Sequence, residues 1–134
     1  MRVFKRQNDE EEVITVVVTA TKGTYIVSQI AKKGLKLQSL ESQENICTLS
    51  YIHQINGAVL SGNAEYLISV SDDGILRVWS LSLKKVIASF NADSALVSCA
   101  IAPDGLTILA GDELGRVHFL RVEGLKTLGS LRGD

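Results

Sequence analysis

Proline and aromatic residues are scarce in this sequence. Its 134 residues include one proline, three phenylalanines, three tyrosines and one tryptophan. Valine, isoleucine, leucine and threonine dominate instead, and these side chains favour β-strands over helices. Because 46% of the residues are hydrophobic, the chain is too apolar to be disordered. We therefore expect an all-β fold with a packed core.

The sequence also lacks an excess of either charge. It has 14 Lys and Arg against 15 Asp and Glu, which gives a formal net charge of -1. This balance excludes the broad basic surface expected of a protein that binds nucleic acid or an anionic membrane. We expect neither kind of partner.

Long apolar runs are absent. The longest apolar stretch, "VITVVV" at 13–18, is far too short to span a bilayer. The charged segment 1–12, "MRVFKRQNDEEE", has no apolar core of the kind that a secretion signal needs. Both features predict a cytoplasmic protein.

Cysteines are few and far apart. Cys47 and Cys99 form no C-x-x-C pair and no Cys/His spacing, which argues against a zinc site or a redox pair. Both lie in apolar runs, so we expect buried structural thiols in a reducing compartment.

The sequence repeats itself at a constant spacing. "GAVLSGNAEYLISVSDDGILRVWSL" at 57–81 aligns without gaps with "SCAIAPDGLTILAGDELGRVHFLRV" at 98–122, so that Gly74 meets Gly115 and Arg77 meets His118. "VVVTATKGTYIVSQIAKKGLKLQSL" at 16–40 is a third copy in the same frame. The three copies predict three similar units, at about 13–52, 53–93 and 94–134.

Each unit has the pattern of four short strands separated by turns. In the middle unit the strands are expected at 56–61, 66–71, 75–81 and 85–90, and the stretches 45–49, 86–90 and 127–131 align as fourth strands. Polar and apolar residues alternate weakly, which favours sheets covered on both faces. A four-stranded sheet repeated every 40 to 45 residues or so is typical of β-propeller blades.

The same residues resemble a known family. "SDDGILRVWS" at 71–80 is similar to the end of a WD repeat, and "CAIAPDGLTILAGD" at 99–112 is similar to its strand–turn–strand core. The resemblance covers about residues 13–134 and implies a WD-repeat β-propeller. The Gly-His dipeptide of the family is missing. The resemblance also implies a buried structural network in the middle blade, formed by His53, Ser69, Asp73 and Trp79.

A finer resemblance concerns the C-terminal end. "AIAPDGLTILAGDELGRVHFLRVEG" at 100–124 is similar to the last blades of bacterial multidomain proteins that join a propeller to a signalling NTPase or another effector. This implies an alternative function as the sensory or regulatory end of such an NTPase.

Three blades are too few for a closed ring, because propellers close with four to eight. The chain is then a fragment of a longer propeller, half of a six-bladed dimer, or an open arc. We expect the first, with the two-chain closure as a testable alternative.

Catalytic motifs are missing. The sequence contains no Walker-type glycine loop, G-x-S-x-G or H-E-x-x-H. Asp72 and Asp73 precede Gly74 in a tight turn, which favours a structural role over a metal site. His118 stands where the middle copy has an arginine, and the terminal "RGD" at 132–134 is interpreted as accidental. We predict no enzyme, metal or cofactor.

Loops are the better candidates for binding. The turns between second and third strands and the connections between blades are expected to share one face, which would contact a protein or peptide partner. The predicted partner-binding residues are Lys32, Lys33, Tyr51, Asp72, Asn91, Asp93, Asp112 and Glu113. The expected function is a non-catalytic protein–protein interaction scaffold.

Overall fold

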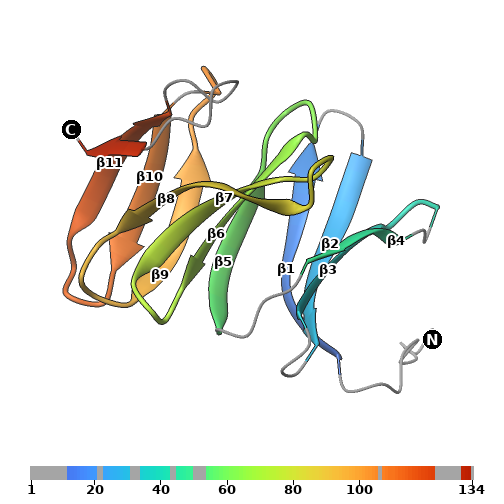
Figure 1. Cartoon of the computed structure of the whole chain (residues 1–134), viewed down its shortest axis with the longest axis horizontal. Helices are drawn as coiled ribbons and strands as arrows, with labels where there is room; N and C mark the ends of the chain where they lie inside the picture. The colour runs from blue at the N-terminus through green and yellow to red at the C-terminus, as the bar shows by residue number, and fades with distance from the viewer. Residues whose placement is uncertain are drawn as a thin grey trace, which may run out of the picture.

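Three four-stranded antiparallel sheets make up the computed structural model of the chain (Figure 1). It describes residues 12–20, 23–30, 34–42, 45–49, 54–105, 107–122 and 131–133. The first sheet contains β1 (Glu12–Ala20), β2 (Gly23–Ile30), β3 (Gly34–Ser39) and β4 (Asn45–Leu49). The second contains β5 (Ile55–Leu60), β6 (Tyr66–Ser71), β7 (Ile75–Ser80) and β8 (Lys85–Asn91). The third contains β9 (Leu96–Ile101), β10 (Thr107–Asp112), β11 (Val117–Val122) and β12 (Leu131–Gly133).

Neighbouring strands in each sheet follow one another in the chain, as the four-strand pattern predicts. The strands of the middle unit begin and end within one residue of their expected bounds. In the third unit the fourth strand was expected at 127–131. Its described part is Leu131–Gly133, where Leu131 pairs with Val122, and residues 127–130 lie outside the described residues.

The sequence repeat recurs in the backbone. The Ser61 N–H donates to the Tyr66 carbonyl at 2.9 Å, and at the aligned positions of the third unit the Ala102 N–H donates to the Thr107 carbonyl at 2.8 Å. Ala64 has a φ of 60° and its counterpart Gly105 a φ of 71°. The second and third units are therefore the same structural module, down to the turn conformation.

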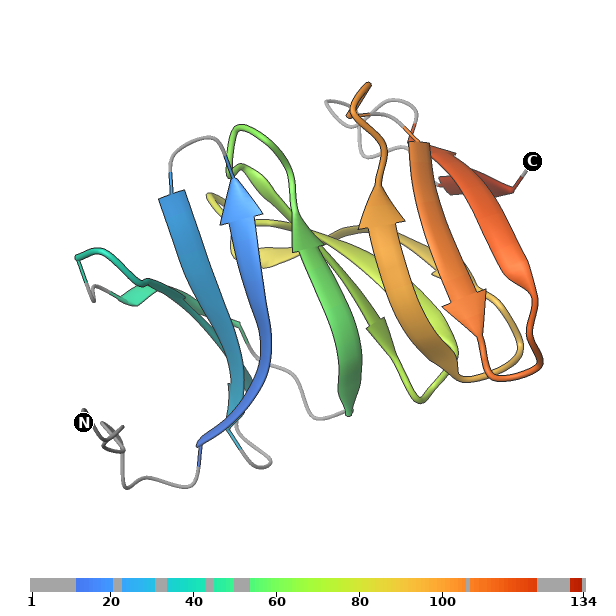
Figure 2. The ribbon, with the colours of Figure 1, turned by 180° about the vertical axis from the view of Figure 1, so that it is seen from behind.

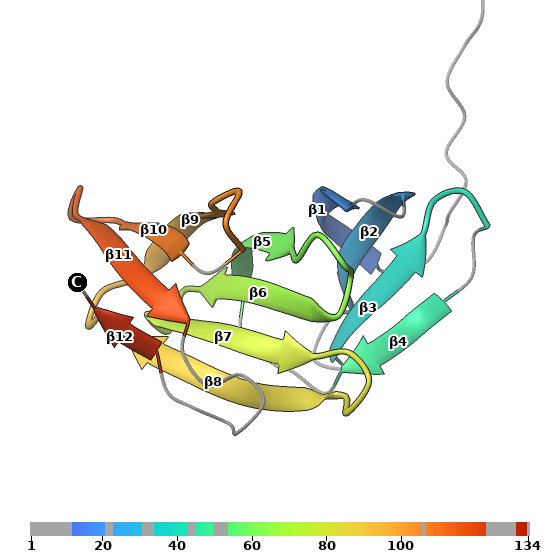
Figure 3. The same ribbon diagram turned by 90° about the horizontal axis from the view of Figure 1, so that it is seen from above.

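The sheets stand side by side as an open arc. β1, β5 and β9 lie along one edge of the arc, and the fourth strands lie along the opposite edge (Figure 3). Figure 2 shows the second sheet between the other two. We call the face that each sheet turns toward the next sheet its front face, and the opposite face its back face.

Two apolar cores separate the three sheets. The first core lies between the first and second sheets and contains Val27, Leu35, Leu37, Leu49, Ile55, Ala58, Leu60, Leu67, Trp79 and Leu81. The second core lies between the second and third sheets and contains Ile68, Val70, Leu76, Val78, Ile87, Ala88, Ala92, Leu96, Ile108, Ala110 and Leu120. Burying each large aliphatic side chain contributes roughly 1.5–3 kcal/mol, so these cores hold the arc together.

The second sheet is covered on both faces. Consecutive residues of a strand point to opposite faces, and Leu67 lies in the first core while Ile68 lies in the second. Both are fully buried, which confirms the expectation for this sheet. The third sheet differs, because Val117 and Phe119 on its front face are 58% and 50% exposed. Among the described residues, none belongs to a helix long and apolar enough to cross a membrane.

Candidate functional site

One end of the arc is built from turns and connections that hydrogen-bond to one another. We call this end the loop face and define it as residues 72–74, 91–95 and 112–116. The Asp72 N–H donates to the Gln54 carbonyl at 3.1 Å, and the Glu113 N–H donates to the Ala95 carbonyl at 2.9 Å. The two bonds occupy aligned positions of the repeat, so each of these sheets ties its turn to the preceding connection in the same way.

Gly74 positions the turn between β6 and β7. Its φ of 81° lies in the left-handed region that glycine adopts without strain. A Cβ at this position would lie 2.9 Å from the Ser94 carbonyl oxygen. The Gly74 carbonyl in turn accepts a bond from the Ala92 N–H at 2.8 Å. The turn therefore packs directly against the connection between the second and third sheets.

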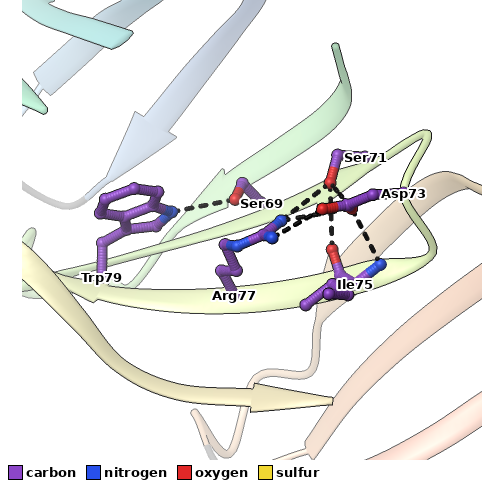
Figure 4. A network of polar contacts seen from close by, with 6 residues as sticks. All are labelled: Ser69, Ser71, Asp73, Ile75, Arg77 and Trp79. Carbon is purple, nitrogen blue, oxygen red and sulfur yellow. Dashed lines mark hydrogen bonds and ion pairs between the residues drawn. The ribbon is translucent and has the colours of Figure 1, made fainter. Parts of the chain in front are cut away.

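Asp73 fixes the inner side of this turn (Figure 4). Its carboxylate accepts bonds from Arg77 Nη2 at 2.6 Å and from the Ile75 N–H at 3.1 Å, and Ser71 Oγ also donates to it. Burial alone would raise the pKa of Asp73, but these donors outweigh it and lower the pKa to about 2. Asp73 therefore serves as a charged structural clamp.

Asp112 is the charged structural clamp of the third sheet, although it aligns with Ser71 and not with Asp73 in the repeat. Its carboxylate lies 2.7 Å from Arg116 Nε and 2.9 Å from His118 Nε2, and it also accepts the N–H of Leu114. Burial opposes the charge, yet these donors hold the pKa of Asp112 well below its usual range. His118 aligns with Arg77, so the third strand keeps its basic side chain in both sheets.

Of the predicted structural network, Ser69 and Trp79 form one direct pair. Trp79 Nε1 donates to Ser69 Oγ at 3.0 Å, and both residues are buried (Figure 4). The described partners of Asp73 are instead Ser71, Ile75 and Arg77. His53 lies outside the described residues.

The predicted partner-binding residues are brought together in part. Four are exposed on the loop face: Asp72, Asn91, Asp93 and Glu113. Asp112 was expected on the same surface, but its side chain is fully buried under Arg116 and His118 and does not face solvent. Lys32, Lys33 and Tyr51 lie outside the described residues, so their place on this surface stays a prediction.

Two further residues of this end of the arc were not singled out from the sequence. Arg116 Nη2 donates to the Ala92 carbonyl at 3.1 Å, and its side chain is 49% exposed. Asn56 Nδ2 donates to Asp72 Oδ1 at 2.6 Å and to the Leu96 carbonyl at 2.8 Å. The only sequence signal for Arg116 is its place directly after the turn glycine Gly115.

The exposed side chains of the loop face are acidic at three positions, and Leu114 is exposed beside them. Asp72, Asp93 and Glu113 carry negative charge, and Arg116 carries positive charge on the same face. Within the described ranges, no group of three or more His, Cys, Asp or Glu side chains is placed to hold a metal ion. The arrangement is a largely polar surface built on hydrogen-bonded turns.

Comparison with known families bears on the middle of the chain. Residues 43–80 match the family described as "WD domain, G-beta repeat". This segment ends at β7 and contains Ser69, Asp73 and Trp79. The resemblance to a WD repeat is thus confirmed for this part of the chain.

Two curated relatives match over a short stretch. WD repeat-containing protein 90 of Homo sapiens is 34% identical over 50 residues, which cover 37% of this chain and 3% of that protein. The Mus musculus protein of the same name is 36% identical over 52 residues, covering 39% of this chain and 3% of that protein. The chain thus spans a very small part of these relatives.

A solved structure shares the fold of nearly the whole chain. The β-propeller domain of Cps50 (Swd1) from Myceliophteria thermophila superposes with a TM-score of 0.74 at 14% identity, covering 92% of this chain and 39% of that chain. The fold is therefore that of three β-propeller blades that do not close into a ring. The finer resemblance to bacterial multidomain proteins, and with it the NTPase alternative, stays a prediction.

Proposed function

We propose that this chain is a non-catalytic scaffold that binds a protein or peptide partner through the loop face. The observation that carries the proposal is the set of exposed acidic side chains held on turns that are rigidly bonded together. Asp93 has a φ of 61° and its N–H bonds to Asn91 Oδ1 at 2.9 Å, so this connection has a defined shape. Rigid elements that display varied loops are a common basis for recognition.

The charge of the loop face indicates the chemistry of the partner. Asp72, Asp93 and Glu113 are exposed, and Arg116 contributes the opposing charge. A segment with basic side chains would find complementary charge here, which favours encounter and correct orientation. WD-repeat propellers generally bind proteins, which supports the same class of partner.

Affinity purification with two charge-reversed variants tests the proposal. Asp93→Lys combined with Glu113→Lys reverses the loop face while leaving Asp73 and Asp112 in place. Glu65→Lys makes the same kind of change at an exposed site in the turn between β5 and β6, at the other end of the second sheet. We expect the double variant to lose proteins that the wild-type chain and Glu65→Lys both retain.

The same experiment can contradict the proposal. If mass spectrometry finds the same bound proteins, in the same amounts, with the double variant as with the wild-type chain, the loop face is only a solvated rim. Circular dichroism of each variant checks that the strands remain folded.

The location of the chain is part of the proposal. Cys99 is a free thiol whose pKa burial raises to about 12, so the thiol stays protonated and unreactive. A free, protected thiol suits a reducing compartment, and we propose the cytoplasm. Fractionation of cells that express the tagged chain would check this.

The scaffold is also proposed to work as part of a larger propeller. Support comes from the front face of the third sheet, where Val117 and Phe119 stay largely exposed. Apolar patches of this kind mark interaction surfaces in soluble proteins.

A further inference from the structure

The front face of the third sheet is exposed where the other two front faces are buried. Val117 is 58% exposed, whereas its counterparts in the second and first copies of the repeat, Leu76 and Leu35, are 0% and 1% exposed. Phe119 is 50% exposed, whereas its counterparts Val78 and Leu37 are 1% and 2% exposed. The same positions therefore form an interface in two sheets out of three.

The two buried front faces show what covers such a surface. The front face of the first sheet packs against the back face of the second, which presents Leu67, Trp79 and Leu81. The front face of the second sheet packs against the back face of the third, which presents Ile108 and Leu120. In both cases the occupant is the back face of another four-stranded sheet.

One back face of this kind is left without a neighbouring sheet in the described structure, on the first sheet. Ile26 there corresponds to the buried Leu67 and Ile108, and is itself partly exposed. Leu40 corresponds to Leu81, and it is 48% exposed where Leu81 is 8% exposed. In the described part of the chain, the third sheet thus presents an exposed front face with two large apolar side chains, and the first sheet presents a partly exposed back face of the same repeat.

We propose that the front face of the third sheet binds the back face of the first sheet of a second copy of this chain. Each chain would supply one front face and one back face, so two copies form two identical head-to-tail contacts. Head-to-tail contacts close into a ring where the rotation per unit allows it. Two chains with three sheets each supply six sheets, within the four to eight that closed propellers contain.

Light scattering coupled to gel filtration of the full chain tests this directly. We expect a mass of two chains, each of 14.5 kDa. A monomer at every concentration would overturn the proposal. The front face would then have to pack against a different sheet, from an adjoining segment or from another protein. A ladder of larger species would also overturn it, since the contacts would then fail to close with two copies.

Substitution on the front face provides the second test. Phe119→Arg would enclose a guanidinium in the contact in place of an apolar ring, which is costly without a partner group. We expect the dissociation constant of the dimer to rise at least about 100-fold, which corresponds to about 2.7 kcal/mol. Ser89→Arg adds the same charge to an exposed position of β8 and should leave the constant within about threefold of wild type.

Substitution on the back face distinguishes a head-to-tail contact from a front-to-front contact. Leu40→Glu should weaken the dimer as well, whereas Leu83→Glu, at a leucine 58% exposed in the turn after β7, should not. An equimolar mixture of Phe119→Arg and Leu40→Glu chains keeps one intact contact, and we expect it to pair more tightly than either variant alone. A dimer that tolerates Leu40→Glu would overturn the head-to-tail geometry.

These results are separable from the proposed binding of a partner through the loop face. Phe119 and Leu40 lie outside the loop face, so their variants report on chain association and not on the charged partner surface. Because both side chains are about half exposed in the single chain, the variants are expected to fold. Circular dichroism and unfolding in urea verify this before the masses are compared.

Discussion

At the scale of single residues, two aspartates, one partly buried and one fully buried, show how a turn stabilises a carboxylate. Asp73 and Asp112 both accept bonds from a side chain on the following strand, Arg77 in one sheet and His118 in the other. The two carboxylates do not align in the repeat, because Asp112 stands where the second sheet has Ser71. Both sheets therefore have a carboxylate beside the basic side chain of the third strand, although the two carboxylates come from different positions of the repeat.

The clamp formed by Asp73 should make stability depend on pH in the acid range. Its folded pKa of about 2 lies below the ordinary 3.8, so its contribution is full above about pH 4 and is lost as the pH falls toward 2. The difference corresponds to about 2 kcal/mol, and solvent screening of the partly exposed pair lowers the contribution below that value. We expect Asp73→Asn to lower the free energy of unfolding by up to this amount at neutral pH, and by little near pH 2.

Urea denaturation of both proteins across this pH range measures the difference. Asp93→Asn, which alters an exposed carboxylate, is the control and should track the wild type. A penalty for Asp73→Asn that stays constant from pH 6 to about pH 2 would show that the charge is not the stabilising feature.

The Trp79–Ser69 pair should be coupled energetically. Trp79→Phe keeps an aromatic ring in the first core but leaves Ser69 Oγ without its 3.0 Å donor. A hydrogen bond of this kind contributes about 1 kcal/mol. A double-mutant cycle with Ser69→Ala should therefore give an interaction energy of about 0.5–1.5 kcal/mol in urea denaturation, and a value near zero would contradict the pairing.

At the scale of the elements, turn geometry and packing can be separated with two glycines. Gly74 and Gly105 have similar φ values of 81° and 71°, but an added Cβ would contact the Ser94 backbone only at Gly74. Gly105→Ala should lower the free energy of unfolding by about 1–2 kcal/mol through backbone strain. Gly74→Ala should lower the free energy of unfolding further, because the added Cβ meets the Ser94 backbone. If denaturant unfolding gives the same loss for both variants, the contact with Ser94 does not add to the loss.

The repeat made the strands and turns predictable, because each copy checks the others. The strands of the middle sheet were placed within one residue, and Asp73 and Gly74 were correctly assigned to a turn. The burial of Asp112 could not be predicted, since an acidic residue in a turn is usually exposed and its partners depend on side-chain packing. The positive φ of Ala64, by contrast, agrees with its alignment to Gly105 in the repeat.

At the scale of the whole molecule, the two ends of the arc are unequal. The front face of the third sheet exposes Val117 and Phe119 beside Arg121, whereas the back face of the first sheet has Gln38 where the other sheets have Trp79 and Leu120. A contact between these ends should therefore bury less apolar area than either internal core. We expect the contact between copies to be weaker than the contact between neighbouring sheets of one chain.

Association between copies should make thermal stability depend on chain concentration. A contact made only by folded chains stabilises them by mass action, so the midpoint Tm should rise by about 5 °C between about 1 μM and about 100 μM. Phe119→Arg should abolish this dependence, whereas Ser89→Arg should keep it. Circular dichroism at the lower concentration and calorimetry at the higher one would measure Tm. If the wild-type Tm stays constant over this range, the folded chain is a monomer, and no second copy covers the front face of the third sheet.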